Sequence, residues 1–110
     1  MPRKTMVTLT ESMFYVLMAL RHGKMCGTDA AEYIKHRTCG ELKIGPATLY
    51  TILGKFEKEK YITQVSQKGR KRTYAITARG AAAYDAEVAR LRRCLEDAQR
   101  EDKNDGQTED

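Results

Sequence analysis

Four of the five residues from 68 to 72 are basic, and the fifth is Gly69. Ammonium and guanidinium groups bind phosphate oxygens strongly, and a glycine within such a run is typical of a tight turn. The pattern favours binding to a polyanion over any covalent reaction, although a solvated surface turn is the alternative explanation. The side chains that we expect to contact phosphates are Lys68, Arg70, Lys71 and Arg72.

An amphipathic helix is expected shortly before this basic run. It is entered through Gly45, and Pro46 occupies its first position, where a missing N–H group costs nothing. One side of this helix carries small, polar or basic residues, and the opposite side carries apolar residues. The apolar residues recur at helical spacing and should face the core: Leu49, Ile52, Leu53 and Phe56.

A helix followed at once by a basic-tipped hairpin is the arrangement with which a winged helix-turn-helix binds DNA. In that arrangement Thr48 and Tyr50 would bind phosphates near the helix N-terminus, and Thr51 and Lys55 would reach base edges. For Tyr50, an intradomain hydrogen bond is the alternative role. The candidate DNA-contacting residues on or beside the helix are Lys43, Ala47, Thr48, Tyr50, Thr51 and Lys55.

Two further helices are expected before this unit. Thr8 and Glu11 fit a capping box that opens a helix reaching about Arg21, with Gly23 as its left-handed cap. Thr28 is the expected N-cap of a second helix, which would end at residues 39–40.

The remaining elements are short strands and one last helix. A strand is expected at residues 42–44, and the hairpin strands are expected at residues 62–65 and 72–76. The last helix begins after Thr77. The fold class is therefore mainly α with a small β-hairpin, a winged helix-turn-helix followed by a C-terminal dimerisation helix. The expected organisation is a flexible N-terminal arm (1–7), a winged helix-turn-helix (8–76), a dimerisation helix (77–99) and a disordered acidic tail (100–110).

Apolar residues recur at steps of three and four along the last helix, from Ala81 to Ala98. No later segment could cover this row, so we expect a second subunit to do so; packing against the chain's own first helix is the alternative. The first helix is apolar around most of its circumference and can therefore contact both its own domain and a partner. The expected dimer interface comprises Met13, Val16, Leu20, Tyr84, Val88, Leu91, Leu95 and Ala98.

Charge and composition agree with a nucleic-acid partner. The 110 residues carry a net charge of +5, but residues 100–110 hold a net −3, so the first 99 residues carry +8. The longest apolar run, residues 13–20, is too short to cross a bilayer, and the N-terminus lacks the features of a secretory signal. We therefore expect a cytoplasmic protein with no membrane partner.

Four ordered motifs lie within residues 10–95: Cys26-Gly27-Thr28, Gly45-Pro46-Ala47-Thr48-Leu49-Tyr50, Lys68-Gly69-Arg70-Lys71-Arg72 and Tyr74-Ala75-Ile76-Thr77-Ala78-Arg79-Gly80. They resemble the motifs of the PadR family of transcriptional regulators. Two positions depart from the family pattern, since Cys26 stands where the family often has His and Ala47 where it often has Gly. The single C-terminal helix resembles the shorter members of the family.

The resemblance implies a homodimeric repressor that blocks transcription sterically from a double-stranded DNA operator. An inducer bound at the dimer interface would move the two recognition helices out of register. Apolar residues in excess of one small core suggest a pocket for a small aromatic inducer, lined by Met13, Tyr15, Met18 and Tyr84. Some family members stack planar drugs between tryptophans, and this chain has no Trp.

Two other classes of function compete with this interpretation. A redox- or metal-responsive regulator would use Cys26, Cys39 or Cys94, and the two histidines have tolerable spacings to the first two of these. However, nothing joins them into a four-ligand site, so we expect no cofactor and no metal. A winged helix that binds protein is the second alternative. The sequence contains no nucleophile elbow, phosphate loop or paired carboxylates in an apolar setting, which argues against an enzyme.

Overall fold

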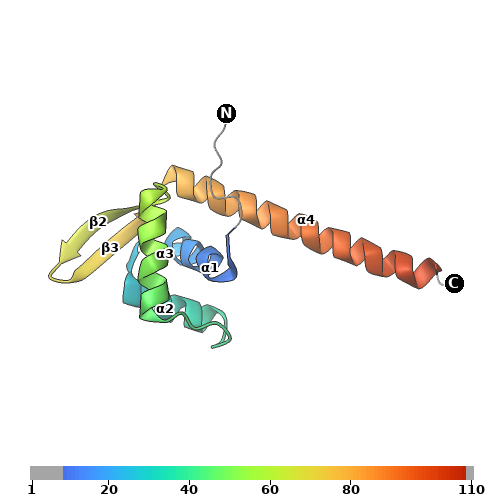
Figure 1. Ribbon diagram of the computed structural model, residues 1–110, viewed down its shortest axis with the longest axis horizontal. Coiled ribbons are helices and arrows are strands. Elements are labelled where there is room, and N and C mark those ends of the chain that lie inside the picture. The colour runs from blue at the N-terminus through green and yellow to red at the C-terminus, as the bar shows by residue number, and fades with distance from the viewer. Residues whose placement is uncertain (1–8, 109–110) are drawn as a thin grey trace.

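The computed structural model describes the backbone of residues 9–108 and the side chains of residues 9–102. Figure 1 shows the first three helices and the hairpin gathered into a body, from which the last helix projects as a long arm. The elements in chain order are α1 (Glu11–His22), β1 (Met25–Cys26), α2 (Gly27–Arg37), α3 (Pro46–Lys58), β2 (Ile62–Lys68), β3 (Lys71–Ile76) and α4 (Ala78–Thr108). This mainly helical architecture with a small antiparallel sheet confirms the predicted fold class.

The first helix begins later than its capping-box motif predicts. Thr10 is the N-cap, because its hydroxyl accepts a hydrogen bond of 3.1 Å from the Met13 N–H group. Leu9 belongs to the buried core, so the chain turns into the helix only after it. The predicted cap Thr8 lies outside the described residues. At the other end Gly23 has φ 177°, which is extended backbone, and the predicted left-handed cap is wrong.

The second helix begins two residues earlier than predicted, directly after a short strand. Met25 and Cys26 pair antiparallel with Tyr74 and Thr73 of β3, and Gly27 is already helical. Cys26 is therefore the N-cap and makes no side-chain capping bond, whereas the sequence predicted this role for Thr28. The strand escaped prediction because its two residues are fixed by a distant partner rather than by local propensity.

The segment between α2 and α3 is a loop and not the predicted strand at residues 42–44. The Thr38 hydroxyl organises it by donating to the Ile34 carbonyl oxygen at 2.9 Å and accepting from the Leu42 N–H group at 3.1 Å. Leu42 and Ile44 pack against the core and so anchor the loop, which accounts for the apolar pattern that suggested a strand.

The third helix has the predicted start and the predicted orientation. Gly45 is its N-cap, and Pro46 occupies its first turn. All four residues predicted to face inward are buried: Leu49, Ile52, Leu53 and Phe56. Their burial leaves the opposite face of α3 toward solvent, as Figure 1 shows for this helix at the front of the body.

The hairpin is longer than predicted and carries one irregularity. The sheet order is β1-β3-β2, with both contacts antiparallel. The register shifts between Gln64 and Ser66, which places a bulge at Val65. The turn contains Gly69 at φ 62°, a left-handed conformation that favours glycine. Because β2 extends to Lys68, the basic residues stand at the far end of a stiff two-stranded wing.

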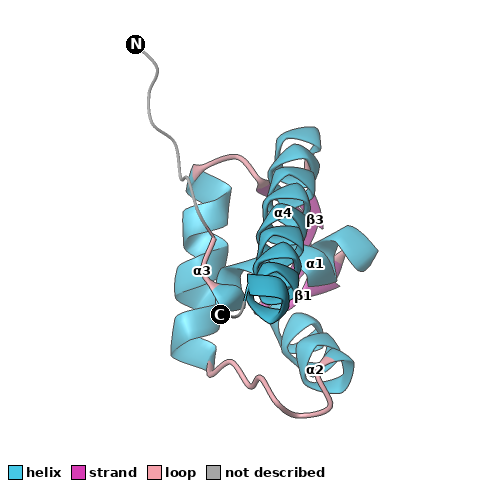
Figure 2. Cartoon of the chain, turned by 90° about the vertical axis from the view of Figure 1, so that its right-hand side faces the viewer, coloured by secondary structure: helices cyan, strands magenta, loops and turns pink. Residues whose placement is uncertain are grey.

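The core is assembled around α1, which contacts α2, α3, β3 and α4. Figure 2, a view along the projecting helix, shows α1 passing behind α4, with α3 to the left and α2 below. The largest fully buried side chains come from three helices: Phe56, Leu17, Ile34, Leu53 and Val16. Burial of each such side chain contributes about 1.5–3 kcal/mol relative to exposure.

The fourth helix is fixed to the body at its first turns. The Thr77 hydroxyl accepts a hydrogen bond of 3.0 Å from the Gly80 N–H group and donates one of 2.7 Å to the Lys60 carbonyl oxygen. A Cβ added at Gly80 would collide with the carbonyl oxygen of Tyr61. The Thr-x-x-Gly sequence therefore lets α4 pack directly on the backbone that joins α3 to β2.

The fourth helix continues to Thr108, beyond residue 99 where the sequence suggested that it would end. The acidic segment contains no proline, and Arg100 pairs with Asp97 one turn earlier, which suits helical structure. From residue 91 to residue 102 every side chain is exposed. Among residues 9–108, no helix combines the length and the apolarity needed to cross a membrane.

Candidate nucleic-acid interface

The outward face of α3 is exposed over its whole length. Thr51 donates its hydroxyl to the Ala47 carbonyl oxygen at 2.9 Å, which folds this side chain back on the helix. Tyr50 is 53% exposed although it is a large aromatic residue. The structure brings five of the predicted residues together on this helix, all of them exposed: Ala47, Thr48, Tyr50, Thr51 and Lys55. Lys43 is also exposed, in the loop before it.

The wing tip concentrates positive charge without compensation. Lys68 and Lys71 lie directly opposite each other across the two strands, and Arg72 lies opposite Gln67. Like charges in this position destabilise a hairpin. Within residues 9–102 none of the tip's four cations forms an ion pair with a carboxylate. A bound anion would relieve this repulsion.

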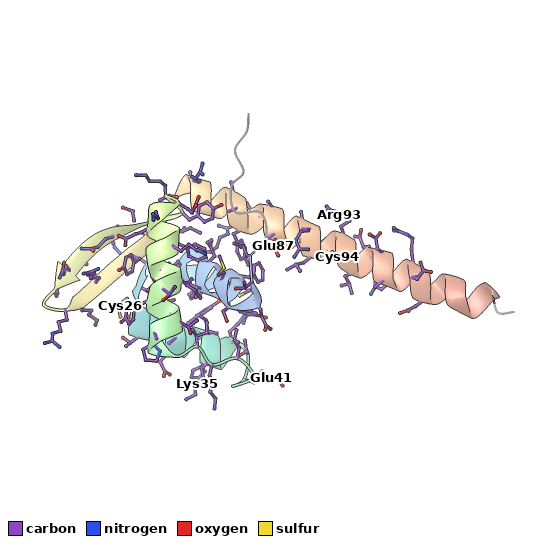
Figure 3. The ribbon with its side chains drawn as sticks, in the orientation of Figure 1. Cys26, Lys35, Glu41, Glu87, Arg93 and Cys94 are labelled. Carbon is purple, nitrogen blue, oxygen red and sulfur yellow. The ribbon has the colours of Figure 1, made fainter. Side chains whose placement is uncertain are left out.

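A cleft of about 650 Å³ joins the wing to the helices. Residues of the wing form one wall, and the start of α2 together with Tyr50 of α3 forms the other. Figure 3 shows Cys26 at this junction, near the start of α2. The lining residues are Cys26, Gly27, Thr28, Tyr50, Gln67, Gly69, Arg70, Lys71, Arg72 and Tyr74. The cleft therefore brings arginines of the wing and hydroxyl groups of two helices to one concave surface.

Gly27 and Thr28 are residues of this surface that the sequence did not suggest. An added Cβ at Gly27 would meet the Tyr50 hydroxyl oxygen at 2.9 Å, so a side chain here would push the ring out of its present position. The Thr28 hydroxyl is 3.2 Å from the Cys26 sulfur. The Gly-Thr pair at the start of α2 was visible in the sequence, but its proximity to Tyr50 depends on how α2 and α3 pack.

The predicted dimer interface divides into buried and exposed parts. Met13, Val16 and Leu20 are 8%, 0% and 2% exposed, because the rest of the chain covers both sides of α1. Within the single chain these three residues therefore leave almost no side-chain surface for a partner. Tyr84 and Val88 are half-buried, whereas Leu91 and Leu95 are 40% and 57% exposed and Ala98 is exposed.

The row of α4 that faces the body is shifted from the predicted apolar row. It contains Glu87, which is only 5% exposed and accepts two hydrogen bonds from Arg90, at 2.6 and 3.0 Å. The hydrogen bond to Glu87 raises the pKa of the Arg90 guanidinium. Figure 3 shows Glu87 nearer to the body and Cys94 further along the projecting helix. Because a charged residue interrupts the apolar pattern of this row, hydrophobic periodicity alone did not predict which side of α4 is buried.

A second cavity of about 530 Å³ lies between α1, α2 and α4. Three of the four predicted ligand-binding residues, Tyr15, Met18 and Tyr84, line it, and Met13 does not. Phe14 stacks on Tyr84 with ring centroids 5.2 Å apart. The remaining lining residues are Arg21, His22, Tyr33 and Arg37. The cavity is thus aromatic on several sides and carries positive charge.

The cysteines and histidines remain dispersed. Cys26 is buried, Cys39 and Cys94 are exposed, and none of the three forms a disulfide in the described chain. His22 lies against the Tyr33 ring at 4.9 Å. Over residues 9–102, no three His, Cys, Asp or Glu side chains gather as a metal site would require.

The architecture defines the class of protein as a winged helix, with α3 in the position of a recognition helix. Solved structures share this fold. A transcriptional regulator from Clostridium thermocellum matches with a TM-score of 0.73 and 22% identity, over 80% of this chain and 89% of that one. Bacillus subtilis PadR, in complex with operator DNA, matches with a TM-score of 0.64 and 23% identity, over 72% of this chain and 47% of that one.

A PadR family transcription regulator from Clostridium difficile also shares the fold, with a TM-score of 0.69 and 17% identity over 80% of this chain and 94% of that one. No curated protein matches the sequence. The model of the transcriptional regulator PadR-like family matches residues 16–86. The chain belongs to this family, and it is a transcriptional regulator rather than an enzyme.

Proposed function

We propose that the chain is a homodimeric, cytoplasmic repressor that binds an operator through α3 and the wing and is released by a small aromatic inducer. The observation that carries this proposal is the continuous surface formed by the exposed face of α3, the basic cleft and the wing tip. A second supporting fact is that the related fold of Bacillus subtilis PadR was solved with operator DNA.

The roles follow from the chemistry of each position. The start of α3 presents Thr48 and Tyr50 to backbone phosphates, where the helix dipole also favours anions. Thr51 and Lys55 lie further along the same exposed face and would reach base edges in the major groove. Lys43 and Ala47 lie beside them. The wing residues Lys68, Arg70, Lys71 and Arg72 neutralise phosphates flanking the groove.

Dimerisation is proposed to occur through the projecting part of α4. Leu91 and Leu95 expose apolar surface on a helix that the rest of the chain does not cover. Tyr84 and Val88 continue this surface toward the body, and Ala98 continues it outward. A two-fold dimer would present two α3 helices to half-sites about one helical turn apart on a pseudo-palindromic operator.

The cavity between α1, α2 and α4 is the proposed inducer site. Tyr15 and Tyr84 offer aromatic walls for a planar ligand, and Arg37 offers a partner for an acidic group. Its walls include α4, so a ligand that separates α4 from α1 would change the spacing of the two α3 helices in the dimer. This coupling requires that the ligand bind the DNA-free arrangement more tightly than the bound one.

Selection from a pool of random duplexes, followed by binding across a salt series, tests the proposal. The wild type should enrich one pseudo-palindromic sequence and bind it with a steep salt dependence. Arg70→Ala with Arg72→Ala should weaken binding and reduce the salt slope by roughly two per subunit, since each phosphate contact contributes about 0.9.

The matched control is Arg92→Ala with Arg93→Ala, which removes the same charge from exposed positions on α4. The control should keep the wild-type slope, because its charges lie away from the wing. A wild type that enriches no sequence, or a control that loses as much affinity as the wing variant, would contradict the proposal.

A further inference from the structure

Gly54 occupies the middle of the exposed face of α3 and has no structural role in the described chain. It lies inside the helix Pro46–Lys58, and the helix continues through it in the ordinary right-handed conformation. A Cβ added at this position would meet no atom within 4 Å. Neither backbone conformation nor packing therefore requires glycine here, and glycine is among the least favourable residues in a helix interior.

The surroundings of Gly54 suggest why a side chain is missing. On the same exposed face, one turn earlier, the Thr51 hydroxyl is held against the Ala47 carbonyl oxygen at 2.9 Å. Longer side chains flank this low surface, with Tyr50 on one side and Lys55 on the other. The helix thus presents its backbone at Gly54 between two polar side chains that can reach past it.

We infer that Gly54 is the point of closest approach between α3 and the base edges of the operator, and that its missing side chain determines specificity. This inference rests on the proposed function. A glycine allows the helix backbone to lie deeper in the major groove than any other residue would, which brings Thr51 and Lys55 within reach of the bases. A Cβ here would hold the helix away from the groove floor.

The test compares Gly54→Ala and Gly54→Leu with the wild type, on the selected duplex and on a random duplex of equal length. Gly54→Ala should raise the melting temperature by about 4 °C, because alanine favours the helix. It should also weaken binding to the selected duplex by about tenfold, the loss expected for one base contact. Gly54→Leu should weaken binding to the selected duplex further. Affinity for the random duplex, which depends on phosphate contacts, should stay unchanged for both.

Gly23→Ala is the matched control. An added Cβ at Gly23 also meets nothing within 4 Å, and its extended backbone accepts any residue, but it lies outside α3 and the wing. This variant should bind both duplexes as the wild type does. If Gly54→Ala binds the selected duplex as tightly as the wild type, or loses equal affinity on both duplexes, the inference is wrong while the proposed function stands. A wild type that selects no sequence would overturn both.

Discussion

The aromatic ring of Tyr50 lies against the backbone of Gly27, so that a Cβ on Gly27 would meet the tyrosine hydroxyl oxygen at 2.9 Å. This contact joins the start of α2 to the exposed face of α3 at the edge of the basic cleft. Tyr50 nevertheless remains 53% exposed. Within residues 9–102 the Tyr50 hydroxyl makes no hydrogen bond, so the intradomain role that the structure shows for this tyrosine is packing against Gly27, while much of the side chain remains open to a ligand.

Gly27→Ala should displace the Tyr50 ring and weaken operator binding by about tenfold, with little loss of fold stability because the ring can swing toward solvent. Measuring affinity for wild type, Gly27→Ala, Tyr50→Ala and the double variant forms a double-mutant cycle. The effect of Gly27→Ala should vanish when Tyr50 is already alanine. Additive losses would show instead that Gly27 acts on DNA binding independently of Tyr50.

Tyr50→Phe separates the hydroxyl from the packing of the ring. It keeps the contact with Gly27, so its melting temperature should match that of the wild type. If the hydroxyl binds a phosphate, affinity should fall by roughly 10- to 150-fold, since a hydrogen bond to a charged group contributes about 1.5–3 kcal/mol. Unchanged affinity would assign Tyr50 a purely structural role.

Local patterns were sufficient to predict the parts of this fold whose signals lie within one turn of helix. The apolar positions of α3, its glycine-proline start and the glycine turn of the wing are of this kind, and the structure confirms them. The inward row of α4 was less visible because buried Glu87 interrupts it. Its neutralisation by Arg90 is a side-chain arrangement that hydrophobic periodicity does not register.

Other features depend on contacts between distant segments and escaped prediction for that reason. β1 exists only because β3 pairs with it, and the role of Gly27 depends on where α3 places Tyr50. A third feature that local patterns did not settle is which of two neighbouring threonines is the N-cap of α1. Thr8 and Thr10 are both of a residue type favoured at an N-cap, and burial of Leu9 in the core favours Thr10.

Gly80→Ala should destabilise the fold more than any exposed substitution in α4. The added methyl group would collide with the backbone carbonyl oxygen of Tyr61, which cannot move without breaking its hydrogen bond of 2.9 Å from the Thr77 N–H group. We expect a loss of about 2–3 kcal/mol in the free energy of unfolding, measured by urea denaturation.

Ala82→Gly is the control for this prediction, because Ala82 is exposed on the same turn of α4. It should cost about 1 kcal/mol through helix propensity alone. Equal losses for the two variants would mean that α4 does not depend on close packing at Gly80.

Arg37→Ala should weaken binding of acidic aromatic ligands to the cavity between α1, α2 and α4. Arg37 lines this cavity, so its loss should reduce affinity by about tenfold or more for acids and leave neutral analogues unaffected. The measurement is the ligand-induced rise in melting temperature, together with release of the selected duplex.

Lys35→Ala removes the same charge from an exposed position on α2 that does not line the cavity, and it should behave as the wild type. A set of aromatic acids that neither raises the melting temperature nor releases DNA would contradict the proposed inducer site.

Leu91→Gln with Leu95→Gln should convert the proposed dimer to monomers without unfolding the winged helix. Both side chains are exposed in the single chain, at 40% and 57%, so replacing them removes no intrachain core. Sedimentation equilibrium should show the change in mass, while the circular dichroism spectrum of the body is retained. Ala89→Gln, an exposed substitution on the opposite side of α4, should leave the dimer intact. Because a monomer contacts only one half-site, the double variant should also lose its preference for the pseudo-palindromic duplex over a single half-site. A variant that stays dimeric would move the interface away from the outer part of α4.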